Sequence, residues 1–256
     1  MIHVFLSPAK NLNEDPERLP PIASHPDLVS HSSKIQDVLK TKKPSQLMKI
    51  QGISMKLADL NWSRNQEWTA DPDPNATIPA ALMFNGEVYQ GLSASKWEEE
   101  DWKFANAHLS ILSGLYGILR PADQILPYRL EMGTPLKVSR KKDLYAFWRP
   151  IMLDYLRNHF SKDTSFIDLS STEYFKVVRQ LKLPNRVIDV KFLDRKNGVY
   201  KPIQFWMKKA RGTMASWIIR NRIHDPADLI RFDEDGYYFS PERSEKDQIV
   251  FIRDEQ

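Results

Sequence analysis

Cysteine is missing from the 256-residue sequence altogether. Disulfide scaffolds, thiolate metal sites and thiol nucleophiles are therefore excluded, and the chain fits a reducing compartment. The sequence also lacks a Walker-type phosphate loop, a GxGxxG loop, an HExxH helix and a GxSxG elbow. Its six histidines follow no metal-ligand spacing. These absences disfavour the familiar hydrolase and kinase classes. We expect neither a metal nor an organic cofactor, and we favour a protein that is not an enzyme without excluding one.

Long apolar runs are missing too. The first apolar stretch, residues 2–6, is too short for the core of a signal peptide, and no basic residue precedes it. No segment approaches the roughly 18 apolar residues that a membrane-spanning helix needs. We therefore expect a cytoplasmic protein that is neither exported by a conventional signal nor inserted in a membrane.

Charge is unevenly distributed, although the whole chain carries a net charge of only +4. Residues 1–119 contain 11 basic and 14 acidic residues, residues 120–222 contain 22 and 9, and residues 223–256 contain 4 and 10. The middle segment alone has a net charge of +13. Such a basic segment between two mildly acidic ends indicates a phosphate-rich partner, above all nucleic acid, unless folding scatters the charges over the surface.

Local patterns predict helices and strands in irregular order. Strands are expected at residues 2–6, 166–169, 186–193, 199–205, 237–239 and 249–252, and helices at residues 30–39, 44–50, 95–108, 143–159 and 206–223. Asn197 and Gly198 predict a β-hairpin turn, and Ser95 is the expected N-cap of the third helix. This order favours the α+β class, with a mixed sheet, over a doubly wound sheet. Residues 1–256 are expected to form a single compact domain.

Residues 47–58 have the apolar and glycine spacing of a helix-hairpin-helix, an element that presents backbone N–H groups to a phosphate. Gly52 lies at the expected turn, whereas Ser54 takes the place of a second glycine. Lys49 and Lys56 flank the turn. The pattern predicts contact with DNA, but an ordinary corner between two helices would need the same Gly52.

The helix expected at residues 206–223 has an apolar face with basic residues beside it. At about 100° per residue, Lys208 and Arg211 lie on one side of that face and Lys209 on the other. Gly212 costs about 1 kcal/mol against alanine inside a helix, so another chain segment or a ligand is expected to approach closely there.

Further basic residues lie in proline- and glycine-rich turns and near strand ends. They are Lys10, Arg120, Arg129 and Lys176. Together with the basic residues of the late helix they would form a phosphate-binding cleft if folding brought them together. The leading interpretation is a cleft for double-stranded DNA, in which a small anionic ligand is also conceivable.

An enzyme acting on a small anionic or nucleotide-like substrate is the alternative interpretation. Its pocket would be surrounded by Ser7, Lys10, Asp168, Glu173 and Lys176. Asp168 or Glu173 would then act as a base beside a cation-stabilised phosphate or carboxylate. A third interpretation, iron sequestration, lacks the carboxylate and histidine spacing of known iron sites.

Short motifs spread from the first strand to the last resemble those of the YaaA family of peroxide stress response proteins. They are SPAK at 7–10, LSGLYGILRP at 112–121, PYRLEMG at 127–133, KDLYAFW at 142–148, EYFK at 173–176, KKARG at 208–212, DGYYF at 235–239 and IVFIR at 249–253. Their spacing is similar to that of the family, and the resemblance is loosest at residues 16–45.

The resemblance implies a bacterial cytosolic protein with a single-domain fold particular to the family. It also implies binding of double-stranded DNA through a basic cleft and a helix-hairpin-helix. The cellular role would be protection of DNA during hydrogen peroxide stress, when free iron drives oxidative damage. Carried onto this chain, the matched basic positions are Lys10, Arg129, Lys176, Lys208, Lys209 and Arg211.

Overall fold

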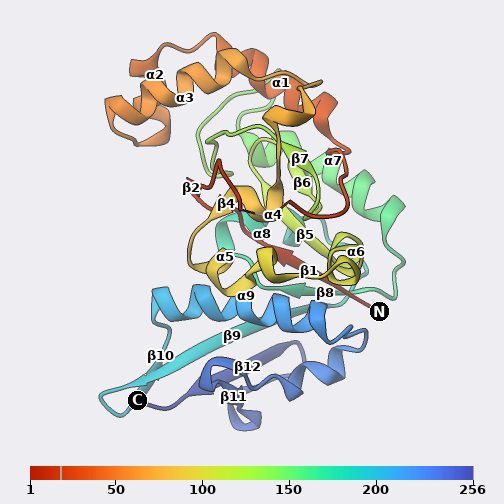
Figure 1. Ribbon diagram of the computed structural model, residues 1–256. Helices are drawn as coiled ribbons and strands as arrows, with labels where there is room; N and C mark the ends of the chain where they lie inside the picture. The colour runs from red at the N-terminus through yellow and green to blue at the C-terminus, as the bar shows by residue number, and fades with distance from the viewer. Residues whose placement is uncertain (18, 256) are drawn as a thin grey trace.

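A mixed sheet of eight strands runs through the protein, whose computed structural model describes residues 1–17 and 19–255 (Figure 1). The strand order is β11-β12-β9-β8-β1-β5-β6, and β10 pairs with the end of β9. The five strands from β12 to β5 are parallel to their neighbours. β6, β10 and β11 pair antiparallel at the margins. The predicted α+β class with a mixed sheet is confirmed.

The strands are short, with the exception of β9. Their bounds are β1 Ile2–Leu6, β2 Asn11–Leu12, β3 Ile78–Pro79, β4 Phe84–Asn85, β5 Leu109–Ser113, β6 Gly117–Leu119, β7 Gln124–Ile125, β8 Ser165–Asp168, β9 Val187–Lys196, β10 Val199–Lys201, β11 Tyr238–Phe239 and β12 Gln248–Arg253. β2 pairs with β4 and β3 with β7, in two small ladders apart from the main sheet.

The α-helices range from one turn to nearly five. Their bounds are α1 Val29–Lys40, α2 Pro44–Gln51, α3 Met55–Glu67, α4 Ala80–Met83, α5 Glu87–Leu92, α6 Glu99–His108, α7 Leu144–His159, α8 Thr172–Arg179 and α9 Gln204–Arg220. Short 3₁₀ turns connect several of them. Within the described residues, none of the helices combines the length and the apolar character that crossing a membrane requires.

β1 and β5 form the centre of the molecule because they are apolar enough to be covered on both faces. Every residue of these two strands is buried, as is usual for parallel strands between two layers of helices. α6 and α9 pack against the sheet and each other, and α7 packs against α8 in a second layer. α1, α2 and α3 gather at one end of the molecule, far from β9 to β12 at the other (Figure 1).

The predicted hairpin is confirmed between β9 and β10. Asn197 and Gly198 adopt φ values of 54° and 76°, which is the left-handed conformation that a two-residue hairpin turn of type I′ requires. The second strand ends at Lys201 rather than at residue 205, because Pro202 cannot donate a hydrogen bond to the ladder. The following helix therefore begins two residues earlier than expected, at Gln204.

The helix expected at residues 95–108 begins later than the capping pattern predicted. Ser95 lies in a 3₁₀ turn, and α6 starts at Glu99 with Glu98 as its N-cap. Trp97 separates the two elements. Its backbone is extended, and its buried indole donates a hydrogen bond to the Ser216 hydroxyl of α9 at 3.1 Å. The burial of this tryptophan outweighs the local capping preference of Ser95.

The second half of α9 is buried on almost all sides, whereas the sequence pattern predicts a single apolar face. Residues 212–219 are all buried, because the sheet lies on one side of α9 and α5 and α6 lie on others. The close approach expected at Gly212 is confirmed. A Cβ atom on Gly212 would lie 1.7 Å from the carbonyl oxygen of Val88, and one on Gly91 would lie 2.1 Å from that of Lys209.

The contact between α5 and α9 predicts a large difference between two glycine-to-alanine substitutions. Gly212→Ala forces two backbones apart, so we expect it to lower the free energy of unfolding by about 3 kcal/mol. Gly52→Ala, at a position with φ +62° and open space around its Cβ, should cost only the left-handed strain of about 1 kcal/mol. Urea denaturation measures both values. Equal losses would show that the α5–α9 contact does not constrain the fold.

Candidate functional site

The carboxyl ends of β1 and β8 lie where the chain changes direction across the sheet. From β1 the chain crosses to β5 on one side, and from β8 it crosses to β9 on the other. The two strands are parallel neighbours, with Phe5 beside Asp168. Connections that leave neighbouring parallel strands in opposite directions open a crevice, and such crevices bind ligands in open sheets. Ser7 and Leu169 follow the two strands at this point.

A cavity of about 440 Å³, here called the central cavity, occupies this crevice. Its lining comes from residues 7–11, 85–89 and 128–131, together with Leu169, Ser171, Glu173, Tyr174, Lys208 and Arg211. A second cavity of about 460 Å³, the side cavity, lies between α8 and β9. Arg211 of α9 lines both cavities. Each volume lies in the range of roughly 300–1,000 Å³ that is typical of small-molecule sites.

Four of the predicted cations line the central cavity, namely Lys10, Arg129, Lys208 and Arg211. Three of them are paired with carboxylates. Glu131 lies 2.9 Å from Lys10 and 3.2 Å from Arg129, and Glu87 lies 3.7 Å from Lys208. The cavity is therefore of mixed charge rather than uniformly positive. An incoming anion has to compete with Glu131 and Glu87 for their cations.

Unlike the other three cations, Arg211 forms no ion pair with a carboxylate among the described residues. Its Nε, like that of Arg129, is covered and has no hydrogen-bond partner there. Burial lowers the pKa of the guanidinium, while the charge of Asp168 acts in the opposite direction. An arginine stays protonated in proteins even so. A positive charge thus lies at the inner boundary of both cavities.

Hydroxyl-bearing side chains also line the central cavity, among them Ser7, Ser171 and Tyr89. The Ser7 hydroxyl accepts a hydrogen bond from the Ser171 backbone N–H at 2.8 Å and donates one to the Ser171 hydroxyl at 3.2 Å. Tyr89 donates to the Ser7 carbonyl at 2.9 Å. Burial raises the pKa of Tyr89, Tyr128 and Tyr174, so all three phenols stay neutral at physiological pH.

The side cavity holds a second set of charged groups. Asp168 accepts hydrogen bonds from the backbone N–H and hydroxyl of Ser170, at 2.9 and 2.8 Å, and lies 3.5 Å from Arg179. Burial raises the pKa of Asp168 to about 6. Lys176 lies over the ring of Tyr145, with its ammonium 4.8 Å from the ring centroid. Arg179 and Lys191 also line this cavity, and the sequence analysis had singled out neither.

The pocket residues of the enzyme interpretation are divided between the two cavities. Ser7, Lys10 and Glu173 line the central cavity, whereas Asp168 and Lys176 line the side cavity. Glu173 accepts a hydrogen bond from the Gly133 backbone N–H at 2.8 Å. That bond fixes the Glu173 carboxylate against the loop that contains Arg129.

The helix pair α2–α3 lies beside the central cavity but does not line it. Gly52 adopts φ +62° at the turn, and the Ser54 hydroxyl caps α3 by accepting from the Leu57 N–H. The Gln51 side chain donates a hydrogen bond to the carbonyl of Arg129 at 3.0 Å. Lys49 and Lys56 are exposed. That this pair acts as a DNA-binding helix-hairpin-helix stays a prediction.

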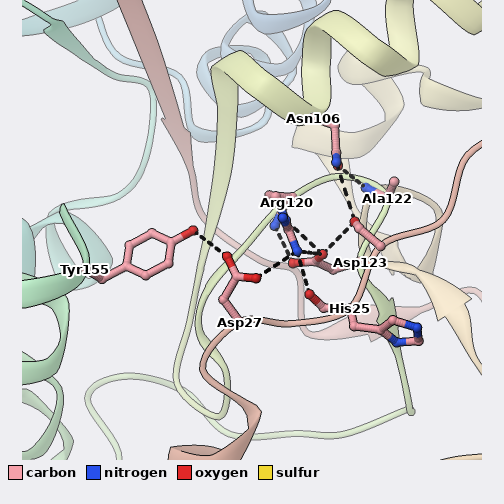
Figure 2. Close-up of polar contacts among 8 residues, drawn as sticks. His25, Asp27, Asn106, Arg120, Ala122, Asp123 and Tyr155 are labelled. Carbon is pink, nitrogen blue, oxygen red and sulfur yellow. Dashed lines mark hydrogen bonds and ion pairs between the residues drawn. The ribbon is translucent and has the colours of Figure 1, made fainter. Parts of the chain in front are cut away.

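Like Lys49 and Lys56, the predicted cations Lys209 and Arg120 line neither cavity. Lys209 pairs with Asp235 at 3.2 Å. Arg120 joins a separate network, in which it contacts Asp123 at 3.1 Å and Asp27 at 3.0 Å, and Tyr155 donates to Asp27 (Figure 2). With two carboxylates around its guanidinium, Arg120 holds neighbouring loops together. That Arg120 contacts nucleic acid stays a prediction.

Acidic partners of the cations are what the sequence analysis missed. Glu131 lies two residues after Arg129 within the PYRLEMG segment, and that spacing was the one available signal. Glu87 is far from Lys208 in sequence, so only the packing of α5 on α9 brings them together. Among the described residues, no group of three or more His, Asp or Glu side chains is arranged to hold a metal ion.

These features define the class of the protein: an α+β protein whose mixed sheet opens a cation-lined crevice at the ends of its central parallel strands. The family model described as peroxide stress protein YaaA matches residues 1–243. The chain belongs to this family, and its role lies in the response to peroxide stress.

The raised pKa of Asp168 predicts a pH-dependent effect of Asp168→Asn. The folded carboxyl has a pKa of about 6, against 3.8 as its ordinary value, so its ionisation costs stability as the pH rises through about 6. The asparagine keeps an acceptor for Ser170 without the charge. From pH 4 to pH 7 we expect the variant to gain up to about 3 kcal/mol relative to the native protein.

Urea denaturation at a series of pH values provides this comparison. Asp163→Asn, an equal charge change at an exposed site, is the matched control against which the Asp168→Asn values are compared. A stability difference between Asp168→Asn and the native protein that stays constant over this pH range would contradict a carboxyl that is hard to ionise.

Proposed function

We propose that the protein binds double-stranded DNA across the mouth of the central cavity and thereby protects DNA during peroxide stress, including damage driven by iron. One observation carries the proposal. Cations from separate parts of the chain, at residues 10, 129, 208 and 211, meet at one cavity, and a helix pair with two exposed lysines is attached beside it. Folding has therefore concentrated part of the basic middle segment.

The exposed lysines at the rim are suited to a phosphate backbone. The side chains of Lys10 and Lys208 are 63% and 45% exposed, so a polymer lying on the surface can reach them. Their pairs with Glu131 and Glu87 are partly exposed, and ion pairs of that kind contribute only about 0–1 kcal/mol. DNA phosphates can replace these carboxylates at small cost, with release of counterions.

Lys208 and Lys209 provide a matched test, because they are adjacent, equally charged and face different partners. Lys208→Gln removes a rim cation, so we expect several-fold weaker binding to every duplex sequence and a salt slope smaller by about 0.9. Lys209→Gln removes the cation beside Asp235, outside both cavities, and should leave binding unchanged. Fluorescence anisotropy over a range of salt concentrations measures both effects.

The same variants test protection. The native protein and Lys209→Gln should slow cleavage of a duplex by ferrous iron and hydrogen peroxide more than Lys208→Gln does. Equal DNA affinity of the two variants would remove the rim of the central cavity as the contact surface.

Glu131 provides a test in the opposite direction, because it pairs with two cations of the cavity. Glu131→Gln frees Lys10 and Arg129 for phosphate and removes a repulsive charge, so we expect a several-fold gain in duplex affinity at low salt. The control is Glu242→Gln, an equal charge change at an exposed site in the 3₁₀ turn Pro241–Arg243. If Glu131→Gln binds duplex no better than Glu242→Gln, DNA does not contact these cations.

A further inference from the structure

The cations of the central cavity differ in exposure, with lysines at its rim and arginines in its interior. Lys10 and Lys208 are exposed at the rim, whereas the Arg129 side chain is only 15% exposed. Arg129 and Arg211 each have a covered Nε without a hydrogen-bond partner among the described residues. A duplex lying on the surface contacts the lysines. The arginines are placed for a ligand small enough to enter.

In the interior of the cavity, Arg129 and Arg211 do not each have a carboxylate partner of their own within the part of the chain that the structure describes. Glu131 is shared between Arg129 and Lys10. The carboxylate whose charge acts on Arg211 is Asp168, which is already bonded to Ser170 and paired with Arg179. A partly buried guanidinium without a carboxylate of its own attracts an anion strongly, because little water screens it.

The donors of the interior come from two elements. Arg211 approaches from α9, and the Ser171 hydroxyl and the first turn of α8 approach from the end of β8. The Ser7 hydroxyl, at the end of β1, already donates to the Ser171 hydroxyl. The Ser171 side chain, at the N-cap of α8, forms no capping hydrogen bond to that turn. A carboxylate has two oxygens for such donors, whereas a phosphate monoester has three acceptor oxygens and a charge near −2. The arrangement fits the phosphate better.

One part of the cavity wall is apolar and aromatic, and the rest carries Asn11, Asn85 and the carboxylates of Glu87, Glu131 and Glu173. Tyr89 and Tyr128 turn their hydroxyls to other partners, the Ser7 carbonyl and the Ser113 hydroxyl, and Leu130 and Tyr174 complete the apolar part of the wall. An aromatic ring stacks on such a surface without a requirement for a particular base. The volume of about 440 Å³ is that of a small-molecule site.

We propose that the central cavity is a binding site for a small organic phosphate monoester of the nucleotide class, with the phosphate at Arg211 and the organic part against the tyrosines. This site goes beyond the proposed binding of duplex DNA and does not require it. Two sources offer the same chemistry, a free nucleotide and the terminal phosphate of a nucleic acid strand. A ligand in the cavity and a duplex across its mouth share Lys10 and Lys208 and should compete.

Isothermal titration calorimetry of the full chain with dAMP tests the site without DNA. We expect one molar equivalent to bind with a dissociation constant below about 1 mM. Inorganic phosphate should bind more weakly and displace dAMP, and deoxyadenosine, which lacks the phosphate, should not bind measurably. Arg211→Gln should weaken dAMP binding at least tenfold. Arg211→Lys, which keeps the charge but loses the fork, should lie in between.

Lys209→Gln is the matched control, since it removes one positive charge from the same helix outside the cavity, and its dAMP affinity should equal that of the native protein. Thermal unfolding of each variant establishes that it is folded. If Arg211→Gln does not fold, Arg211→Lys takes its place as the test variant. Absence of dAMP and phosphate binding to the native protein would overturn the proposal. So would equal losses in Arg211→Gln and Lys209→Gln.

The source of the phosphate is decided by single strands with and without a 5′-phosphate. If the 5′-phosphorylated strand binds more tightly than the unphosphorylated strand and at least as tightly as dAMP, the site is assigned to strand ends. If dAMP binds more tightly than the phosphorylated strand, the site is assigned to free nucleotides. Duplex binding is measured separately, with a DNA duplex whose ends are blocked. Failure of either proposal is thus visible without the other.

Discussion

The parallel pairing of β1 with both β5 and β8 is the constraint on which the rest of the structure depends. Because all three strands run the same way, their carboxyl ends meet at one edge of the sheet. The connections from β1 and β8 then leave in opposite directions, and the crevice between them becomes the central cavity. Apolar side chains over the full length of β1 and β5 hold these strands in the middle of the sheet.

The close contact of α5 with α9 sets the opposite wall of the cavity. Gly91 and Gly212 let the two backbones meet without side chains between them. This contact brings Glu87 to Lys208 and directs Arg211 toward the ends of the central strands. The same packing that stabilises α9 therefore positions its cations, so variants of the helix need a stability measurement beside any binding measurement.

Charge balance distinguishes this site from a simple basic groove. The middle of the sequence has a net charge of +13, yet Glu131 and Glu87 neutralise part of the charge where the cations meet. The exposed ion pairs at the rim contribute little, so phosphates can replace their carboxylates. The covered Arg211 has no carboxylate partner among the described residues, and a ligand that stays on the surface does not supply one. Under the two proposals, one crevice would serve a polymer outside and a small anion inside.

The sequence by itself determined the local elements whose signals are short-ranged. The Asn197–Gly198 turn, the buried strand β1 and the close approach at Gly212 follow from backbone freedom and apolar runs, and the structure has all three. Ser95 misled as a cap, because the burial of Trp97 against α9 is a long-range contact that no local pattern contains.

Only the tertiary structure decided which cations meet. Lys208 and Lys209 are neighbours in the same basic motif, but a helix turns about 100° per residue, and one faces the cavity while the other faces Asp235. Arg120 has the same charge and is held in another network. The sequence gives the charge of each residue. The packing of distant segments decides where its side chain points and which carboxylate lies opposite it.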